Sequence, residues 1–243
     1  MKAKQWIITI LLVTGIFLIF DFIKDRIVNT VWNSWSLPLS GKIIYLDPGH
    51  GGVDGGAEHG DAVEKEIALE VAKKLKDYLQ QQGALVLMTR ETDQDLADEG
   101  TKGLSRRKVI DLNRRANLIN ESKADLFISI HLNSIPSHRW RGAQTFYSTR
   151  FIENKIAAEF IQEELIETLE NTNRKAKPLN NIYLLKSAKK PGVLVEIGFL
   201  SNPEERELLM KDDYQEKVAV GIYRGVMRYF TDEKEKLLEE EKE

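Results

Sequence analysis

Residues 42–52 read KIIYLDPGHGG, a short apolar run rich in β-branched residues that leads directly into a glycine-rich loop. This pattern predicts a strand over residues 42–46 that ends in a tight polar loop. A helix is expected next, over residues 64–82, because apolar residues recur four positions apart and Gly83 follows as a stop signal. The stretch therefore begins a strand–loop–helix unit.

The same alternation continues along the chain. Further strands are predicted over residues 84–89, 126–130, 143–147, 182–185 and 193–195, and further helices over residues 106–120, 154–169, 203–209 and 214–229. Strands that alternate with helices are typical of a sheet covered on both faces. We expect an α/β fold, a single three-layer domain with a mostly parallel or mixed central sheet, preceded by a hydrophobic N-terminal helix.

The N-terminus has the pattern of an export signal. A basic MKAK precedes the apolar run WIITILLVTGIFLIF, and no small-residue cleavage site follows it. Residues 6–23 just reach the length of roughly 17 residues that a membrane-spanning helix needs. We predict a signal peptide or signal anchor over residues 1–23, a linker over 24–40, a catalytic domain over 41–231 and an acidic tail over 232–243.

The composition restricts the chemistry. The chain has no cysteine and four histidines, so any metal must be held by His, Asp or Glu, and disulfides are excluded. Its 35 Lys and Arg against 38 Asp and Glu leave no basic excess to neutralise phosphates, which argues against nucleic acid as a partner.

Polar side chains follow three of the predicted strands at the point where each strand ends. His50 lies in the loop after KIIYL, His131 follows LFISI, and Glu196 follows VLV. Ligands of open α/β sheets bind at the carboxyl ends of the strands, so these side chains are expected to meet at one edge. Glu64, at the start of the first long helix, is expected on the same side.

Two histidines and one carboxylate, with one position left for water, are the typical ligands of a catalytic zinc ion. A second carboxylate that does not bind the metal would carry protons. Glu196 suits that role, because burial beside an apolar strand favours the protonated acid. The chemistry alone does not assign Glu64, since an acid at a helix start is also favoured by the helix dipole.

Other polar residues are expected to be ordinary surface groups. His59 and His138 do not follow strand ends, so we expect both on the surface. The arginine pairs at 106–107 and 114–115 are expected on the solvated side of their helix, with binding of an anionic substrate as the alternative.

Several segments resemble the zinc-dependent N-acetylmuramoyl-L-alanine amidases, which cleave the amide between muramic acid and the stem peptide of peptidoglycan. The similar segments are LDPGHGGVDGGA, VEKEIALEVAKKL, MTRETD, RRANLIN, ADLFISIHLNS and PGVLVEIGFLSNPEE, and they extend from about Gly41 to Phe230. The resemblance implies one zinc ion (Zn2+) held by His50, Glu64 and His131, with Glu196 as the catalytic residue and peptidoglycan as the substrate.

Within that family the chain is similar to the germination-specific amidases of spore-forming bacilli, in its size and in the segments WSLPLSGKIIYLDPGHGG and GTKGLSRRK. This resemblance implies removal of stem peptides from the spore cortex, leading to muramic-δ-lactam, and a location outside the cytoplasm, between the forespore membranes. Residues 93–107 are longer and more charged than the usual family spacer, so no substrate contact is carried over there. A need for a protein activator is left open.

Two alternatives stay open on the residues alone. A zinc peptidase or deacetylase of the cell wall would use the same metal site. A non-catalytic, membrane-anchored wall-binding module would need no metal, although an acid such as Glu196 in an apolar strand argues against it.

Overall fold

The computed structural model describes Thr14, Gly15, Phe20 and residues 37–231. The chain divides into two compact units, Met1–Leu37 and Pro38–Glu243. Apart from those three N-terminal positions, the expected signal or anchor over residues 1–23 lies outside the described residues, as does the tail over 232–243. Within the described residues, no helix combines the length and the apolar character needed to cross a membrane.

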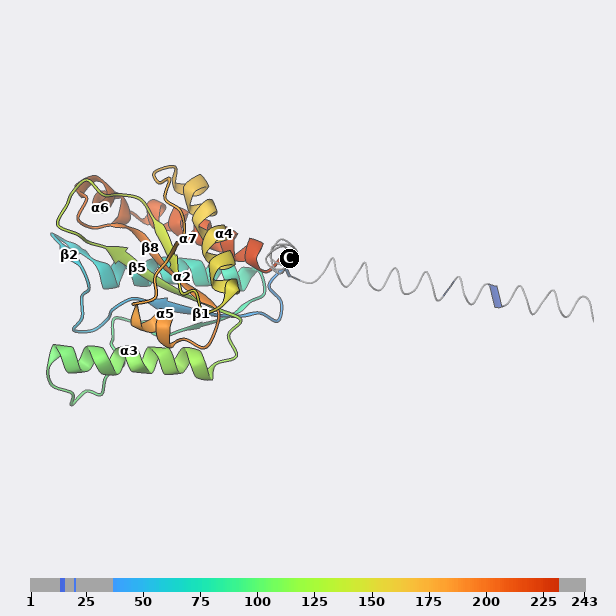
Figure 1. Cartoon of the computed structure of the whole chain (residues 1–243), viewed down its shortest axis with the longest axis horizontal. Helices are drawn as coiled ribbons and strands as arrows, with labels where there is room; N and C mark the ends of the chain where they lie inside the picture. Colours follow the sequence, from blue (N-terminus) through green and yellow to red (C-terminus); the bar gives the residue numbers. More distant parts are fainter. Residues whose placement is uncertain (1–13, 16–19, 21–36, 232–243) are drawn as a thin grey trace, which may run out of the picture. The chain divides into compact units, whose positions relative to one another are not determined.

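A six-stranded mixed sheet forms the centre of the second unit (Figure 1), with the strand order β4-β1-β5-β8-β6-β7. Paired strands are parallel except β6, which runs antiparallel to β8. The strands are β1 (Ile43–Pro48), β4 (Leu85–Met88), β5 (Leu126–Asn133), β6 (Gln144–Tyr147), β7 (Lys177–Pro178) and β8 (Gly192–Phe199). A separate short hairpin joins β2 (Glu58–His59) to β3 (Ala62–Val63).

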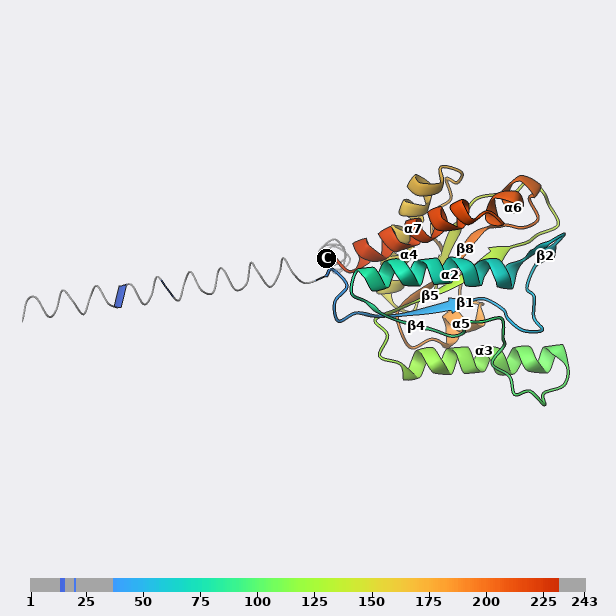
Figure 2. The same cartoon turned by 180° about the vertical axis from the view of Figure 1, so that it is seen from behind.

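Helices cover both faces of the sheet (Figures 1 and 2). The helices are α2 (Glu64–Gln81), α3 (Leu104–Glu121), α4 (Ile152–Leu169), α5 (Tyr183–Ser187), α6 (Pro203–Leu209) and α7 (Asp212–Tyr229). One apolar core joins the sheet to α2, α4 and α7, and a second core joins its other face to α3 and α5. The expected α/β domain with a mixed central sheet is confirmed.

The apolar spacing that predicts the first helix does place one side of α2 in the core. Ile67, Val71, Leu75 and Leu79 are all buried there. Leu39, close to the end of the expected linker, is fully buried in the same core, and its amide donates to the carbonyl oxygen of Gln82. The chain is thus attached to the domain just before β1 begins.

The strand expected over residues 182–185 is wrong, because these residues begin the helix α5. Leu184 and Leu185 are both buried against the second core, whereas a strand on a sheet surface would bury only alternate residues. Tyr183 and Lys186 remain exposed. A short apolar run does not distinguish a strand from a helical turn until its packing partner is known.

Two glycines of α7 face α4, the helix against which α7 packs. A Cβ atom at Gly225 would lie 2.4 Å from the backbone Cα of Ile161, so the two helix backbones approach too closely for any side chain. At Gly221 the nearest atom to such a Cβ is a side-chain methyl of Leu165, at 3.1 Å. Close contact between α4 and α7 therefore depends on glycine at 225 more than at 221.

We predict that Gly225→Ala destabilises the domain by about 1–3 kcal/mol, because the new methyl group meets backbone that cannot move without separating the helices. Gly221→Ala is the matched control, and we expect it to be nearly neutral, since a flexible side chain can move and alanine favours a helix by about 1 kcal/mol. Urea unfolding of both variants measures the difference. Equal losses would contradict this account of the helix contact.

Candidate metal centre and active site

Three side chains from separate elements converge at the carboxyl edge of the sheet. His50 follows β1, Glu64 is the first residue of α2, and His131 lies in β5. Oε1 of Glu64 lies 3.2 Å from Nε2 of His50 and 2.9 Å from Nδ1 of His131. One ligand atom from each residue lies within 4.8 Å of the other two, so the three could hold a single metal ion.

Backbone amides hold the Glu64 carboxylate in position. Ala57 donates its amide to Oε2 at 2.8 Å, and Leu132, next to His131, donates to Oε1 at 3.0 Å. Burial opposes ionisation, but hydrogen bonds from His131 and His50 outweigh it and lower the pKa of Glu64 well below its usual range. Glu64 is therefore an anion that is only 4% exposed.

The backbone at His50 is unusual, with a φ of 58° in the left-handed region that few residues other than glycine adopt. Its Nδ1 is hydrogen-bonded to Oδ2 of Asp54 at 2.9 Å, which directs Nε2 toward Glu64. Burial lowers the pKa of His50, but the hydrogen bonds to Asp54 and Glu64 outweigh that effect and raise it to about 9. A carboxylate behind a ligating histidine is a common way to orient the ring at a metal site.

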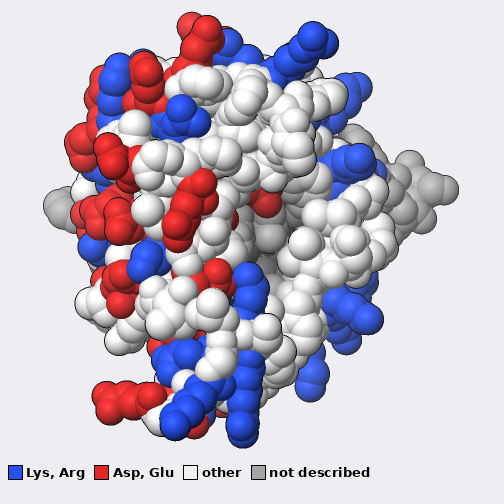
Figure 3. All heavy atoms as spheres, turned by 90° about the vertical axis from the view of Figure 1, so that its left-hand side faces the viewer, with Lys and Arg blue, Asp and Glu red and all other residues white. Residues whose placement is uncertain are grey.

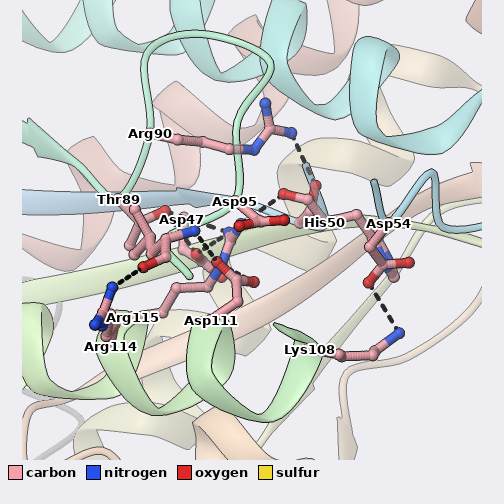
Figure 4. A network of polar contacts seen from close by, with 12 residues as sticks. Asp47, His50, Asp54, Thr89, Arg90, Asp95, Lys108, Asp111, Arg114 and Arg115 are labelled. Carbon is pink, nitrogen blue, oxygen red and sulfur yellow. Dashed lines mark hydrogen bonds and ion pairs between the residues drawn. The ribbon is translucent and has the colours of Figure 1, made fainter. Parts of the chain in front are cut away.

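Two buried arginines hold the loop that carries His50 (Figure 4). Arg115 of α3 pairs with Asp47 at 2.8 Å and donates to the carbonyl oxygens of Pro48 and His50. Arg90, after β4, donates to the carbonyl oxygens of Pro48 and Gly49. The expectation that the arginine pair at 114–115 lies on a solvated helix side is wrong for Arg115, which is 1% exposed.

Residues 93–107 make ion pairs both with the rest of the domain and within the segment. Asp93 accepts from the amide of Gly52 in the loop after His50 and pairs with Lys65 at 2.7 Å. Asp95 accepts two hydrogen bonds from Arg107. The charged segment thus supports the metal loop from outside.

Glu196 lies in β8 directly opposite His131 of β5. Its Oε2 atom is buried and has no hydrogen-bond partner among the described residues. Burial raises the pKa of Glu196 to about 7, against the opposing effect of the nearby His131. A carboxyl group of this kind can both accept and donate a proton near neutral pH.

A pocket of about 220 Å³ joins these groups. His50, His131 and Glu196 line it, together with Lys108 of α3 and Tyr183 of α5. Figure 3 shows the face of the molecule on the left of Figure 1, which is hollowed near its centre, with Asp and Glu on one side and Lys and Arg below and on the other. Apolar side chains such as Leu112 and Leu194 line much of the pocket, and charged groups of both signs, among them Asp54 and Lys108, border it.

The residues present suit a zinc ion. Two imidazole nitrogens and one carboxylate oxygen converge, and the chain has no thiolate to compete. No Cβ is possible at Gly49, because it would lie 2.4 Å from Cε1 of His131, so glycine leaves room for that ring. Glu196 is not part of the converging group, which leaves it free for proton transfer.

His59 and His138 do not join this group. His59 is hydrogen-bonded through Nε2 to Oγ of Ser134 at 2.9 Å, and Nδ1 of His138 donates to the carbonyl oxygen of Ser201 at 2.6 Å. His138 is exposed, as expected, whereas His59 of β2 is half-buried.

Comparison with known proteins identifies the family of the chain. A family model described as N-acetylmuramoyl-L-alanine amidase matches residues 44–228. The chain belongs to the N-acetylmuramoyl-L-alanine amidase family. The family predicted from the sequence motifs, and the prediction that the protein is an amidase, are confirmed.

Individual relatives agree with this assignment. The germination-specific N-acetylmuramoyl-L-alanine amidase of Bacillus subtilis is 58% identical over 95% of this chain and 97% of its own length. The amidase LytC of the same organism is 33% identical over 86% of this chain, which spans only 38% of LytC. Among solved structures, the CwlD amidase of Clostridioides difficile, in complex with the GerS lipoprotein, is 41% identical, with a TM-score of 0.76 over 78% of this chain and 98% of that one.

Sequence patterns missed the residues that support the site. Asp54, Arg90 and Arg115 act by positioning His50, and nothing in the periodicity of the sequence marks them. The sequence does mark Asp47, because a charged residue that follows the apolar run KIIYL needs a partner if it is buried.

We predict that Gly49→Ala weakens zinc binding by about 10- to 100-fold, because its methyl group would displace the His131 ring. Titration calorimetry with zinc measures the affinity. Gly100→Ala is the control, since a Cβ there meets no atom within 4 Å. An unchanged zinc affinity in Gly49→Ala, with the fold intact by circular dichroism, would contradict the assignment of His131.

Proposed function

We propose that this protein hydrolyses the amide bond between the lactyl group of N-acetylmuramic acid and L-alanine of the peptidoglycan stem peptide. The observation that carries the proposal is the buried, unpaired carboxyl oxygen of Glu196, directly across the sheet from the converging group of His50, Glu64 and His131. Membership of the amidase family supports the choice of bond.

In this proposal His50, Glu64 and His131 hold one zinc ion. When bound there, zinc supplies a Lewis acid that acidifies an attacking water and polarises the amide carbonyl. The Glu64 carboxylate provides the negative charge of the site. Asp54 holds His50, and the amides of Ala57 and Leu132 hold Glu64.

Glu196 moves the proton. Its carboxylate accepts a proton from the attacking water as the oxygen adds to the amide carbon. It then delivers that proton to the nitrogen of L-alanine as the carbon–nitrogen bond breaks. The products are a lactyl carboxylate on the sugar and a stem peptide with a free amino terminus. A pKa near neutrality suits a group that performs both transfers.

We infer that the substrate is spore cortex peptidoglycan. A relative named a germination-specific amidase that is 58% identical over nearly the whole chain supports this. Loss of the stem peptide leaves a free lactyl carboxylate on the muramic acid, which is the group needed for later closure to muramic-δ-lactam. The activity would therefore precede lactam formation.

We further propose that the chain acts outside the cytoplasm, with residues 1–23 as its signal or membrane tether. The basic start and the uninterrupted apolar run support this. Recovery of the native protein in the cytoplasmic fraction of sporulating cells would contradict it. The GerS complex of the C. difficile amidase supports a protein partner here as well.

Digestion of defined muropeptides, followed by mass spectrometry, tests the reaction. We expect an intact stem peptide with L-alanine at its amino terminus and a disaccharide with a free lactyl carboxylate. A chelator should abolish both products, and added zinc should restore them. Shortened stem peptides would indicate a peptidase, released acetate a deacetylase, and unchanged substrate a non-catalytic module; each of these results contradicts the proposal.

Two variants separate the proposed roles in the same assay. Glu196→Gln should retain stoichiometric zinc but lose activity by about 10²- to 10⁴-fold, because no group then accepts the proton. His131→Ala should lose both zinc and activity. Glu66→Gln, an exposed acid of the same helix as Glu64, is the control and should retain both. Near-normal turnover by Glu196→Gln would exclude its catalytic role.

A further inference from the structure

A second, wider groove is lined by none of the residues of the catalytic pocket and has no role in the chemistry proposed above. It has a volume of about 690 Å³ and lies between the loop before β6 and the turn after α4. The side chains that line it are Arg139, Trp140, Arg141, Glu170, Asn171, Thr172, Asn173 and Arg174. It combines a large aromatic ring with three arginines and one acid.

Trp140 and Arg174 form a stacked platform in this groove. The guanidinium of Arg174 lies 5.4 Å from the centre of the Trp140 ring and 5.0 Å from that of Phe199. Arg174 is fixed there, because it donates to the carbonyl oxygen of Arg141 and to Oε1 of Gln144. Trp140 nevertheless remains 53% exposed. The Trp140 ring is therefore open to solvent while the arginine that lies over it is held in place by hydrogen bonds.

The loop that carries Trp140 is attached to the domain on both sides. Gly142 donates its amide to the fully buried carboxylate of Glu205, which also accepts from the amide of Phe199. Before Trp140, the carbonyl oxygen of His138 accepts from the side chain of Asn202. A ligand that stacks on Trp140 thus meets a preorganised surface and avoids much of the entropic cost of ordering a loop.

Gln144 of β6 links the groove to the catalytic residue Glu196. Gln144, the residue to which Arg174 donates, pairs directly with Glu196 across the antiparallel β6–β8 ladder. Directly opposed residues of an antiparallel pair lie on the same face of a sheet, with Cβ atoms about 5 Å apart. A substrate whose scissile bond lies at Glu196 can therefore continue over Gln144 to the platform.

The chemistry of the groove matches a glycan strand of peptidoglycan. The apolar face of a pyranose ring packs on an indole ring, whose face is electron-rich. Arginine binds carboxylates in a planar, two-bonded geometry, and the strand carries lactyl or stem-peptide carboxylates at every muramic acid. Three arginines line the groove against Glu170, and one of them, Arg141, also pairs with Glu204 at 3.3 Å. Three positive groups against two negative ones leave the groove with the charge opposite to that of the strand's carboxylates.

We propose that the groove of Trp140 and Arg174 is a glycan-binding subsite, which holds the sugars next to the muramic acid whose peptide is removed. This assignment rests on the proposed amidase function, because it takes the strand to be the substrate. Trp140 packs on an N-acetylated sugar ring, and Arg139, Arg141 and Arg174 bind the carboxylates of the neighbouring muramic acids.

Comparing long and short substrates tests the subsite. With soluble, uncrosslinked peptidoglycan strands, Trp140→Ala should lower kcat/KM by about tenfold, mainly through KM, as expected for the loss of one aromatic contact. With an N-acetylmuramoyl-peptide, which carries no neighbouring sugar, its kcat/KM should match that of the unaltered protein. Trp140→Phe should restore most of the loss, because it keeps a stacking ring.

The charge contribution is tested by a matched pair of arginines. Arg141→Ala should raise KM for long strands and reduce its dependence on salt, since one carboxylate contact is lost. Arg106→Ala removes the same charge from the exposed surface of α3 and should change neither value. Equal effects of the two variants would indicate a general surface charge effect and overturn the subsite.

A binding measurement separates this proposal from the reaction itself. The chain has four tryptophans, so replacing Trp6, Trp32 and Trp35 by Phe leaves Trp140 as the fluorescent reporter. Titration with peptide-free strands of N-acetylglucosamine and N-acetylmuramic acid should change its emission saturably, with or without zinc.

The outcomes of these tests are distinct. No emission change on titration, or an equal loss of activity by Trp140→Ala on long and short substrates, overturns the glycan subsite while leaving the amidase function in place. Emission that responds to the glycan when no muropeptide is cleaved would instead refute the proposed reaction and retain the binding site. Loss of protein-partner binding by Trp140→Ala, with strand turnover unchanged, would assign the surface to a partner and overturn the proposal.

Discussion

The buried ion pair between Asp47 and Arg115 is the interaction on which the site depends. Asp47 lies near the end of β1, accepts hydrogen bonds from Thr89, which follows β4, and from Ser129 of β5, and pairs with Arg115. Asp47 is 2% exposed, so removing Arg115 leaves a buried carboxylate without its ion-pair partner, at a cost of about 3–5 kcal/mol. Arg115 itself also pairs with Asp111 at 2.8 Å. The remaining donors of Arg115 hold the carbonyl oxygens of the loop that carries His50. The same guanidinium therefore pairs with the buried carboxylate of Asp47 and positions the loop that carries His50.

The parallel arrangement of β1, β5 and β8 explains why residues far apart in the chain form one site. Parallel strands end at the same edge, so His50, His131 and Glu196 meet although long helices separate them. The stability cost of this arrangement falls on Glu196, whose buried Oε2 has no hydrogen-bond partner among the residues that the structure describes. A perturbed acid of this kind, next to converging metal ligands, is typical of a site kept for catalysis. On the other side of β8, β6 runs antiparallel and connects the pocket to the exposed platform of Trp140 and Arg174.

Much of the fold and the site could be predicted, and the errors have physical reasons. His50, His131 and Glu196 each follow an apolar run in the sequence, so these three residues could be named from the pattern, although β5 and β8 continue past His131 and Glu196. Glu64 was named only through the resemblance to the amidase family. The short apolar run of α5 was misassigned because only the second core, which takes both Leu184 and Leu185, distinguishes a helical turn from a strand. Arg115 was expected in solvent because its neighbours on α3 are polar, and its buried partner Asp47 lies 68 residues away.

The sequence by itself determined the alternation of strands and helices, the exclusion of thiolate metal sites, the amidase family and the residues offered as metal ligands. These follow from local periodicity, from residue chemistry and from motif spacing. Only the tertiary structure decided that Glu64 Oε1 lies within hydrogen-bond distance of both histidines, and that Arg90 and Arg115 hold the His50 loop. It also decided that Arg174 lies over Trp140 and bonds Gln144, the strand partner of Glu196. Each of these is a contact between residues distant in the chain, and whether such residues meet is set by strand order and helix packing rather than by local sequence.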